Sequence, residues 1–103
     1  MRITLSTGTP AELARPEGGS PTQGLVLIPD IGGLRPLFDE HCARLADEHG
    51  LVVCAPELFP GDEDKALDWR LQHAGDRTDD LRLADIVAAA DATECERVGV
   101  IGF

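Results

Sequence analysis

The hydrophobic pattern of the chain is dominated by three short runs in which apolar residues follow one another with little alternation. They cover residues 25–29, 51–55 and 98–103. A strand with one solvated face alternates apolar and polar residues, whereas a strand buried on both faces is apolar throughout. The three runs therefore predict strands of a parallel sheet that is covered on both sides.

Two segments between these runs have helical periodicity. Over residues 36–48, apolar side chains recur every three or four positions, at Phe38, Cys42 and Ala46. Pro36 is a favourable first helical residue, and Gly50 is a favourable terminator. A second amphipathic helix is expected over residues 79–92. Each helix has one apolar face that would lie on the sheet.

The first 24 residues have a different pattern. Residues 2–7 and 11–15 are short alternating pieces separated by the turn signal Gly8-Thr9-Pro10, which predicts an antiparallel β-ribbon. A polar loop then leads into the strand–helix–strand–helix–strand series of residues 25–103. This order predicts an α/β fold with a mainly parallel sheet flanked by helices and joined by right-handed crossovers.

The last run creates a packing problem. A parallel strand as apolar as residues 98–101 needs cover on both faces, and the chain offers only two sizeable helices. Residues 1–103 by themselves would leave an apolar surface. We therefore expect them to be the N-terminal part of a single larger domain, with a second copy of the chain as the other possible cover.

Composition and charge narrow the partner classes. Of 103 residues, 43% are hydrophobic and 27% are charged, which is a normal globular mixture, and the net charge is −10. That charge repels nucleic acids and anionic membrane surfaces, so neither is expected as a partner. No run approaches the roughly 18 apolar residues of a membrane span, and the start of the chain alternates where a signal peptide would be continuously apolar. A cytoplasmic protein is the expectation.

The three cysteines add no metal or redox site to this picture. Cys42, Cys54 and Cys95 are far apart, form no C-x-x-C pair and have no histidine at metal-ligand spacing. This usage is typical of free thiols in a reducing compartment. Cys54 lies inside an apolar run and is expected to pack as a small hydrophobic residue. We expect neither a metal nor a cofactor.

The first candidate for chemistry is the turn that follows residues 25–29. It contains Asp30, Ile31, Gly32 and Gly33, and ligands collect at the carboxyl ends of strands in open α/β sheets. The backbone N–H of Ile31 is a candidate oxyanion-hole donor, and Gly32 would let a substrate approach the backbone closely. The same four residues are also compatible with an ordinary tight turn.

The second candidate is the end of the sequence. Residues 98–103 resemble a strand that runs into the first glycine of a G-x-[Ser/Cys]-x-G nucleophile elbow, which would place a reactive residue at position 104. Two other interpretations remain open. A dinucleotide-binding G-x-G-x-x-G motif for NAD(P) would require glycine at position 104. A non-catalytic interaction module would bury the exposed strand in a homodimer.

Taken together, the motifs resemble the dienelactone hydrolase family of the α/β-hydrolase superfamily. The resemblance extends from about Leu25 to Phe103 and includes Pro29-Asp30-Ile31-Gly32-Gly33, Cys54-Ala55-Pro56-Glu57-Leu58-Phe59 and the closing Gly102-Phe103. It implies hydrolysis of a carboxylic ester or lactone, with transfer of the acyl group to a cysteine or serine directly after Phe103. The family's aspartate and histidine would lie later in the chain. Asp30 matches a glutamate that contacts the nucleophilic thiol in the family.

One family feature is missing. Enzymes that open dienelactone carry an arginine upstream of a tryptophan that matches Trp69, where it binds the substrate carboxylate. Here that stretch contains Asp62, Glu63 and Asp64, which argues against dienelactone itself. Lys65 or Arg70 would have to bind an anionic substrate instead. The expected partner is a small ester or lactone, and the protein is expected to be a monomer or a homodimer.

Overall fold

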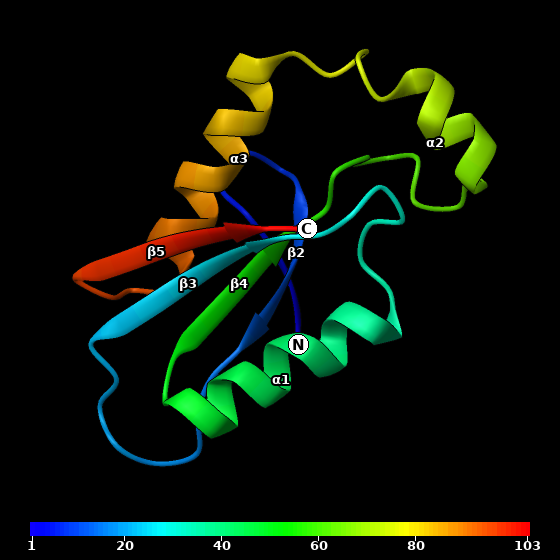
Figure 1. The fold of residues 1–103 in the computed structure, drawn as a ribbon. Helices are drawn as coiled ribbons and strands as arrows, with labels where there is room; N and C mark the ends of the chain where they lie inside the picture. Colours follow the sequence, from blue (N-terminus) through cyan, green and yellow to red (C-terminus); the bar gives the residue numbers. More distant parts are fainter.

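The computed structural model describes residues 1–103, which form one five-stranded mixed sheet with three helices (Figure 1). The spatial order of the strands is β1-β2-β4-β3-β5. The strands are β1 (Arg2–Thr4), β2 (Pro10–Ala14), β3 (Gln23–Ile28), β4 (Val52–Pro56) and β5 (Arg97–Gly102). The helices are α1 (Pro36–His49), α2 (Leu67–His73) and α3 (Asp79–Ala92). The α/β fold class predicted from the sequence is confirmed.

The sheet combines a parallel centre with an antiparallel side. β3 pairs in parallel with both β4 and β5, whereas β1 pairs antiparallel with β2. β2 also pairs antiparallel with β4. The predicted N-terminal ribbon is therefore present, but it continues the main sheet instead of standing apart from it.

The parallel strands are continuously apolar because a helix covers each face of the sheet. In β4, Val52 and Cys54 pack with α3, whereas Val53 and Ala55 pack with α1. Successive side chains of a strand point to opposite faces, so a strand covered on both sides needs apolar residues at every position. Figure 1 shows α1 and α3 on opposite sides of the strands.

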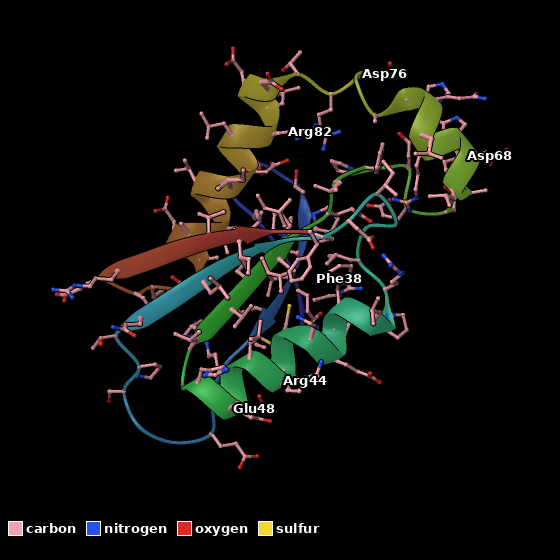
Figure 2. The ribbon with its side chains drawn as sticks, viewed as in Figure 1. Phe38, Arg44, Glu48, Asp68, Asp76 and Arg82 are labelled. Carbon is pink, nitrogen blue, oxygen red and sulfur yellow. The ribbon has the colours of Figure 1, made fainter.

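Helix α1 begins and ends at the predicted signals. Pro36 is at its start, and Gly50 ends it in a left-handed conformation with φ 65°, where the Gly50 N–H donates to the Ala46 carbonyl at 2.9 Å. The buried side of the helix consists of Phe38, Cys42 and Ala46. Figure 2 shows Phe38 toward the sheet and Arg44 and Glu48 on the outer side of the same helix.

Helix α2 was not predicted, because the sequence around Trp69 was interpreted only as an acidic segment. The helix has seven residues and lacks a continuous apolar stripe. Its stabilisation comes from side-chain contacts within the helix and with the preceding loop, which a search for apolar periodicity does not detect. The rings of Trp69 and His73 stack at 4.1 Å, and the buried Arg70 side chain bonds to carbonyls of the preceding loop.

Strand β5 has the apolar surface that the sequence led us to expect. It pairs only with β3, and the exposed fractions of Val100, Ile101 and Phe103 are 56%, 44% and 57%. Covering these side chains would require additional protein. A separate finding concerns membranes: none of the three helices is long and apolar enough to cross a bilayer.

Candidate active site

The carboxyl ends of β3, β4 and β5 meet at one edge of the sheet. Ile28 of β3 is in register with Gly102 of β5, and the Phe103 N–H donates to the Ile28 carbonyl at 3.1 Å. The turn of residues 29–33 therefore leaves β3 directly beside the point where β5 ends. On the other side of β3, β4 delivers Glu57 to the same edge.

Asp30 closes the turn through both its backbone and its side chain. The Gly33 N–H donates to the Asp30 carbonyl at 2.9 Å, and the Gly32 N–H donates to the Asp30 carboxylate at the same distance. Arg35 then donates to both carboxylate oxygens, from Nη1 to Oδ1 at 2.7 Å and from Nη2 to Oδ2 at 3.0 Å. The Asp30 carboxylate is thus held by a bidentate guanidinium from the start of α1.

This ion pair determines the charge of the turn. The hydrogen bonds from Arg35 hold the pKa of the Asp30 carboxyl below its ordinary value, and the Gly32 N–H acts in the same direction, while partial desolvation opposes both. Asp30 is therefore ionised at neutral pH. Both side chains remain partly exposed, so the pair contributes more to local geometry than to stability.

Ile31 lies between these anchored residues. Its backbone N–H donates to no protein acceptor, as an oxyanion-hole donor must in the absence of substrate. Gly32 lies against the Arg35 side chain, because a Cβ atom there would overlap Arg35 Nη1. A side chain at position 32 would consequently displace the guanidinium that holds Asp30.

Arg70, expected to bind substrate, is an internal residue with only 4% of its surface exposed. Its Nε donates to the Lys65 carbonyl at 3.0 Å and its Nη2 to the Glu63 carbonyl at 2.8 Å. The guanidinium also lies over the Phe59 ring, 5.1 Å from its centroid. Two of its five N–H donors are therefore bonded to carbonyls of the 59–65 loop, and Nη1 lies beside Gly33.

Two residues at this edge were missed by the sequence analysis. Glu57 follows β4 directly and is 2% exposed, and its Oε2 accepts the Leu58 N–H at 2.6 Å. Arg35, the partner of Asp30, was the other. Glu57 stands after an apolar strand just as Asp30 does, so its position at the strand end was the available signal. Nothing local to Arg35 indicated which carboxylate it would bind.

An aromatic group borders the end of β5. The Phe103 ring makes edge contacts with the rings of Phe38 and His41, at centroid distances of 5.6 Å and 5.2 Å. The Arg35 guanidinium lies over the Phe38 ring at 5.1 Å. Phe103 is therefore in contact with the first turns of α1.

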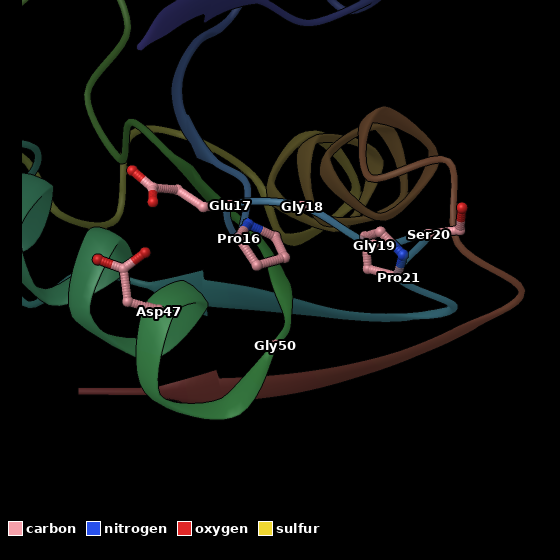
Figure 3. A pocket seen from close by; sticks show the side chains of 8 residues that line it. All are labelled: Pro16, Glu17, Gly18, Gly19, Ser20, Pro21, Asp47 and Gly50. Carbon is pink, nitrogen blue, oxygen red and sulfur yellow. The ribbon is translucent and has the colours of Figure 1, made fainter.

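The largest cavity lies elsewhere. It measures about 550 Å³ and is at the opposite end of the sheet, where the loop before β3 passes the end of α1 (Figure 3). Its lining is polar or small and contains neither a histidine nor a cysteine: Pro16, Glu17, Gly18, Gly19, Ser20, Pro21, Asp47 and Gly50. It brings together none of the candidate site residues Asp30, Ile31, Gly32 and Arg70.

Neither Cys42 nor Cys54 supplies a nucleophile at the carboxyl ends of the strands. Burial raises the pKa of Cys42 to about 12 and that of Cys54 to about 11, so both are neutral thiols at physiological pH. They pack in the two core clusters on opposite faces of the sheet. No group of three or more His, Cys, Asp or Glu side chains is arranged to hold a metal ion.

Comparison with known proteins gives a consistent result. The sequence model of the dienelactone hydrolase family matches residues 9–103. The chain is 26% identical over 102 residues to the hydrolase pyvD of Aspergillus violaceofuscus, an alignment that covers 91% of this chain and 42% of that protein.

Solved structures show the same relationship. The structure named m3DLH matches with a TM-score of 0.74 at 26% identity, over 100% of this chain and 48% of its own. A structure from Klebsiella pneumoniae has the same TM-score and coverage at 22% identity, and it supports the fold alone. The chain thus spans about half the length of the proteins that it matches.

Proposed function

Because the chain belongs to the dienelactone hydrolase family, we propose that it forms the N-terminal part of a single α/β-hydrolase domain that cleaves a carboxylic ester or lactone. The family match favours this function over dinucleotide binding and over a purely structural module. The observation that supports the site assignment is the pairing of β3 with β5, because it puts Phe103 beside the turn that contains Ile31.

The proposed reaction is acyl transfer to a cysteine or serine at position 104. Its sulfur or oxygen attacks the carbonyl carbon, and the carbonyl electrons move onto oxygen to form a tetrahedral oxyanion. The N–H of Ile31 and the N–H of the residue after the nucleophile donate to that oxyanion. The general base takes the proton of the attacking thiol or hydroxyl. When the intermediate collapses, the leaving alkoxide takes that proton from the protonated base and departs as the alcohol. Water then releases the acid and regenerates the nucleophile.

Asp30 has a proposed electrostatic role in this scheme. A carboxylate near a cysteine nucleophile disfavours the thiolate, because the two would be adjacent negative charges. Asp30 would thereby help to keep the thiol protonated until substrate binds. The bidentate contact with Arg35 fixes the carboxylate and partly neutralises it, so the strength of this effect depends on the ion pair.

The proposed substrate class rests on how Arg70 and Lys65, two cations near the candidate site, are already bound by other groups of the protein. Arg70 is buried and bonded to loop carbonyls, and the Lys65 ammonium lies over the Trp69 ring at 5.7 Å. Asp62, Glu63 and Asp64 add negative charge to the same loop. We therefore propose an uncharged ester or lactone in preference to an anionic lactone such as dienelactone.

The function is tested with the full-length protein. We expect p-nitrophenyl acetate to be hydrolysed with an initial burst of p-nitrophenol, because the acyl-enzyme accumulates when deacylation is slow. Alanine in place of the residue after Phe103 is expected to lower kcat by about 1000-fold or more. A reactive ester probe should label the peptide that follows Phe103, as measured by mass spectrometry. Labelling at any other residue, or undiminished activity of the alanine variant, would refute the assignment.

A further inference from the structure

Two oppositely charged and almost fully buried side chains lie beside Gly33, in the turn of residues 29–33. Glu57 is 2% exposed and comes from the end of β4, and Arg70 is 4% exposed and comes from α2. A Cβ atom at position 33 would lie 2.5 Å and 2.8 Å from the two Glu57 carboxylate oxygens and 2.8 Å from Arg70 Nη1. Only the hydrogen of a glycine fits between them.

The conformation of Gly33 adds a second requirement for glycine. Its φ is 68°, in the left-handed region that residues with a side chain rarely adopt. Its N–H donates to the Asp30 carbonyl at 2.9 Å and closes the turn that contains Ile31. The backbone of Gly33 therefore links the two buried charges to the candidate oxyanion-hole donor.

The burial of Glu57 and Arg70 lowers the stability of the folded protein. Glu57 Oε1 and Arg70 Nη1 have no hydrogen-bond partner, and no ion pair within 4.0 Å joins the two side chains. Buried charged groups that lack partners are destabilising. A pair that served stability alone would close to a direct contact, whereas here the backbone of Gly33 lies against both.

Each charged group is held by its own surroundings. The Glu57 carboxylate accepts a hydrogen bond from the Leu58 N–H. The backbone N–H of Glu57 donates to the Pro10 carbonyl of β2 at 2.9 Å. Arg70 is held by the carbonyls of Glu63 and Lys65. The two side chains are thus fixed from the sheet and from the α2 segment, so they can impose a position on Gly33.

We propose that Glu57 and Arg70 are positioning residues that clamp Gly33 and thereby hold the Ile31 N–H where the oxyanion forms. This role rests on the hydrolase function proposed above. The clamp acts on the transition state more than on the bound substrate, because the hydrogen bond to the oxyanion becomes strong only when charge develops on the carbonyl oxygen.

The test uses Glu57→Gln in the full-length protein. Glutamine keeps the size of the side chain and removes its charge. We expect kcat for p-nitrophenyl acetate to fall by about 10- to 100-fold while KM changes by less than about 2-fold, the pattern of a lost transition-state interaction. Arg70→Lys should likewise lower kcat and leave KM almost unchanged, because an ammonium group retains the charge but cannot reproduce the planar guanidinium with its several N–H donors.

Asp85→Asn provides the matched control. Asp85 is also a buried acid, but it forms an ion pair with Arg77 and makes no contact with Gly33. Its replacement should lower the melting temperature and leave kcat per folded molecule unchanged. If Glu57→Gln and Arg70→Lys lose activity only in proportion to lost folded protein, or if KM and not kcat changes, the positioning role is wrong.

A measurement independent of activity separates this inference from the proposed function. In ¹H–¹⁵N spectra of the full-length protein, Glu57→Gln should shift the amide signals of Gly33 and Ile31, and Asp85→Asn should leave them in place. If the wild-type protein has no esterase activity, the hydrolase proposal fails and the amide signals still decide whether the clamp exists. Unshifted Gly33 and Ile31 signals in Glu57→Gln would overturn the clamp.

Discussion

The two buried carboxylates, Asp85 and Glu57, differ in how completely they are hydrogen-bonded. Asp85 in α3 accepts hydrogen bonds from Thr7 and Thr9, at 2.7 Å and 2.8 Å, and forms an ion pair with Arg77 at 2.7 Å. Every oxygen of this carboxylate has a partner. Glu57 keeps one carboxylate oxygen without a partner. The first arrangement ties the β1–β2 turn to α3, whereas the second lies beside the candidate active site.

The Asp85 network predicts a loss of stability in Asp85→Asn. An asparagine cannot satisfy two hydroxyl donors and a guanidinium equally well, so the free energy of unfolding at pH 7 should fall by about 1–3 kcal/mol. Urea denaturation monitored by circular dichroism measures the difference. A variant as stable as the wild type would show that the network contributes nothing.

The same residue predicts a pH dependence. Desolvation acts to raise the pKa of Asp85, but the hydrogen bonds from Thr7, Arg77 and Thr9 outweigh it and hold the pKa below its ordinary value. The unfolded state therefore takes up the proton first as the pH falls, and the stabilisation present above about pH 4 is lost below it. The stability gap between the wild type and Asp85→Asn should narrow on acidification. A gap that stays constant from neutral to acid pH would contradict this.

Thiol reactivity is a further residue-scale prediction. Cys42 and Cys54 are buried and their pKa values are raised, whereas Cys95 is partly exposed. Of these three cysteines, iodoacetamide should therefore alkylate Cys95 first in the native protein, and the other two only after denaturation. Peptide mass spectrometry quantifies the modification. Rapid native labelling of Cys42 or Cys54 would show that the core opens more readily than this packing implies.

At the scale of elements, β3 approaches α3 closely where Gly24 faces Thr93. A Cβ atom at position 24 would lie 2.8 Å from Thr93 Oγ1 and 3.0 Å from its Cβ, and Thr93 is 1% exposed. Gly24→Ala should therefore lower the free energy of unfolding by about 1–3 kcal/mol through overpacking. Thermal and urea denaturation both report the change.

The neighbouring strand offers the matched control. Gly99 of β5 pairs in register with Leu25, and a Cβ atom there would meet nothing closer than a Leu25 methyl carbon at 3.8 Å. Gly99→Ala should be tolerated with little change in stability. Equal effects of the two substitutions would mean that loss of a strand glycine, and not the contact with Thr93, is responsible.

At the scale of the whole molecule, residues 1–103 leave β5 as an edge strand whose outer side is unpaired. β5 pairs on one side only, and its Val100 and Ile101 and the following Phe103 are exposed. An unpaired strand with apolar faces is a template for association. Residues 1–103 produced by themselves should therefore form soluble aggregates and bind a hydrophobic dye, as measured by light scattering and fluorescence.

Val100→Lys is the informative variant for this prediction. A lysine on an exposed edge strand discourages pairing with another chain, so the variant should aggregate less without loss of helix content. Arg44→Lys, on the solvent side of α1, is the control and should behave as the unmodified segment does. A stable monomer or a discrete dimer of residues 1–103 would instead favour the interaction-module interpretation.

The positions of the main elements followed from the sequence because their signals are local. The apolar runs predicted β3, β4 and β5, and the spacing of Phe38, Cys42 and Ala46 predicted the buried side of α1. Helix α2 gave no such signal, since its stability depends on Arg70 and on the stacking of Trp69 with His73. Periodicity detects a helix only when one face is apolar.

For the candidate site, the sequence by itself predicted that Asp30 and Ile31 lie at the carboxyl end of an apolar strand, whereas the equivalent position of Glu57 after the next strand was not recognised. Only the tertiary structure decided how their charges pair. It joined Asp30 to Arg35 and brought both Glu57 and Arg70 against Gly33. The reason is physical: strand and helix formation depend on side-chain periods within one segment, whereas ion pairing depends on the distances between segments, which only the packed fold sets.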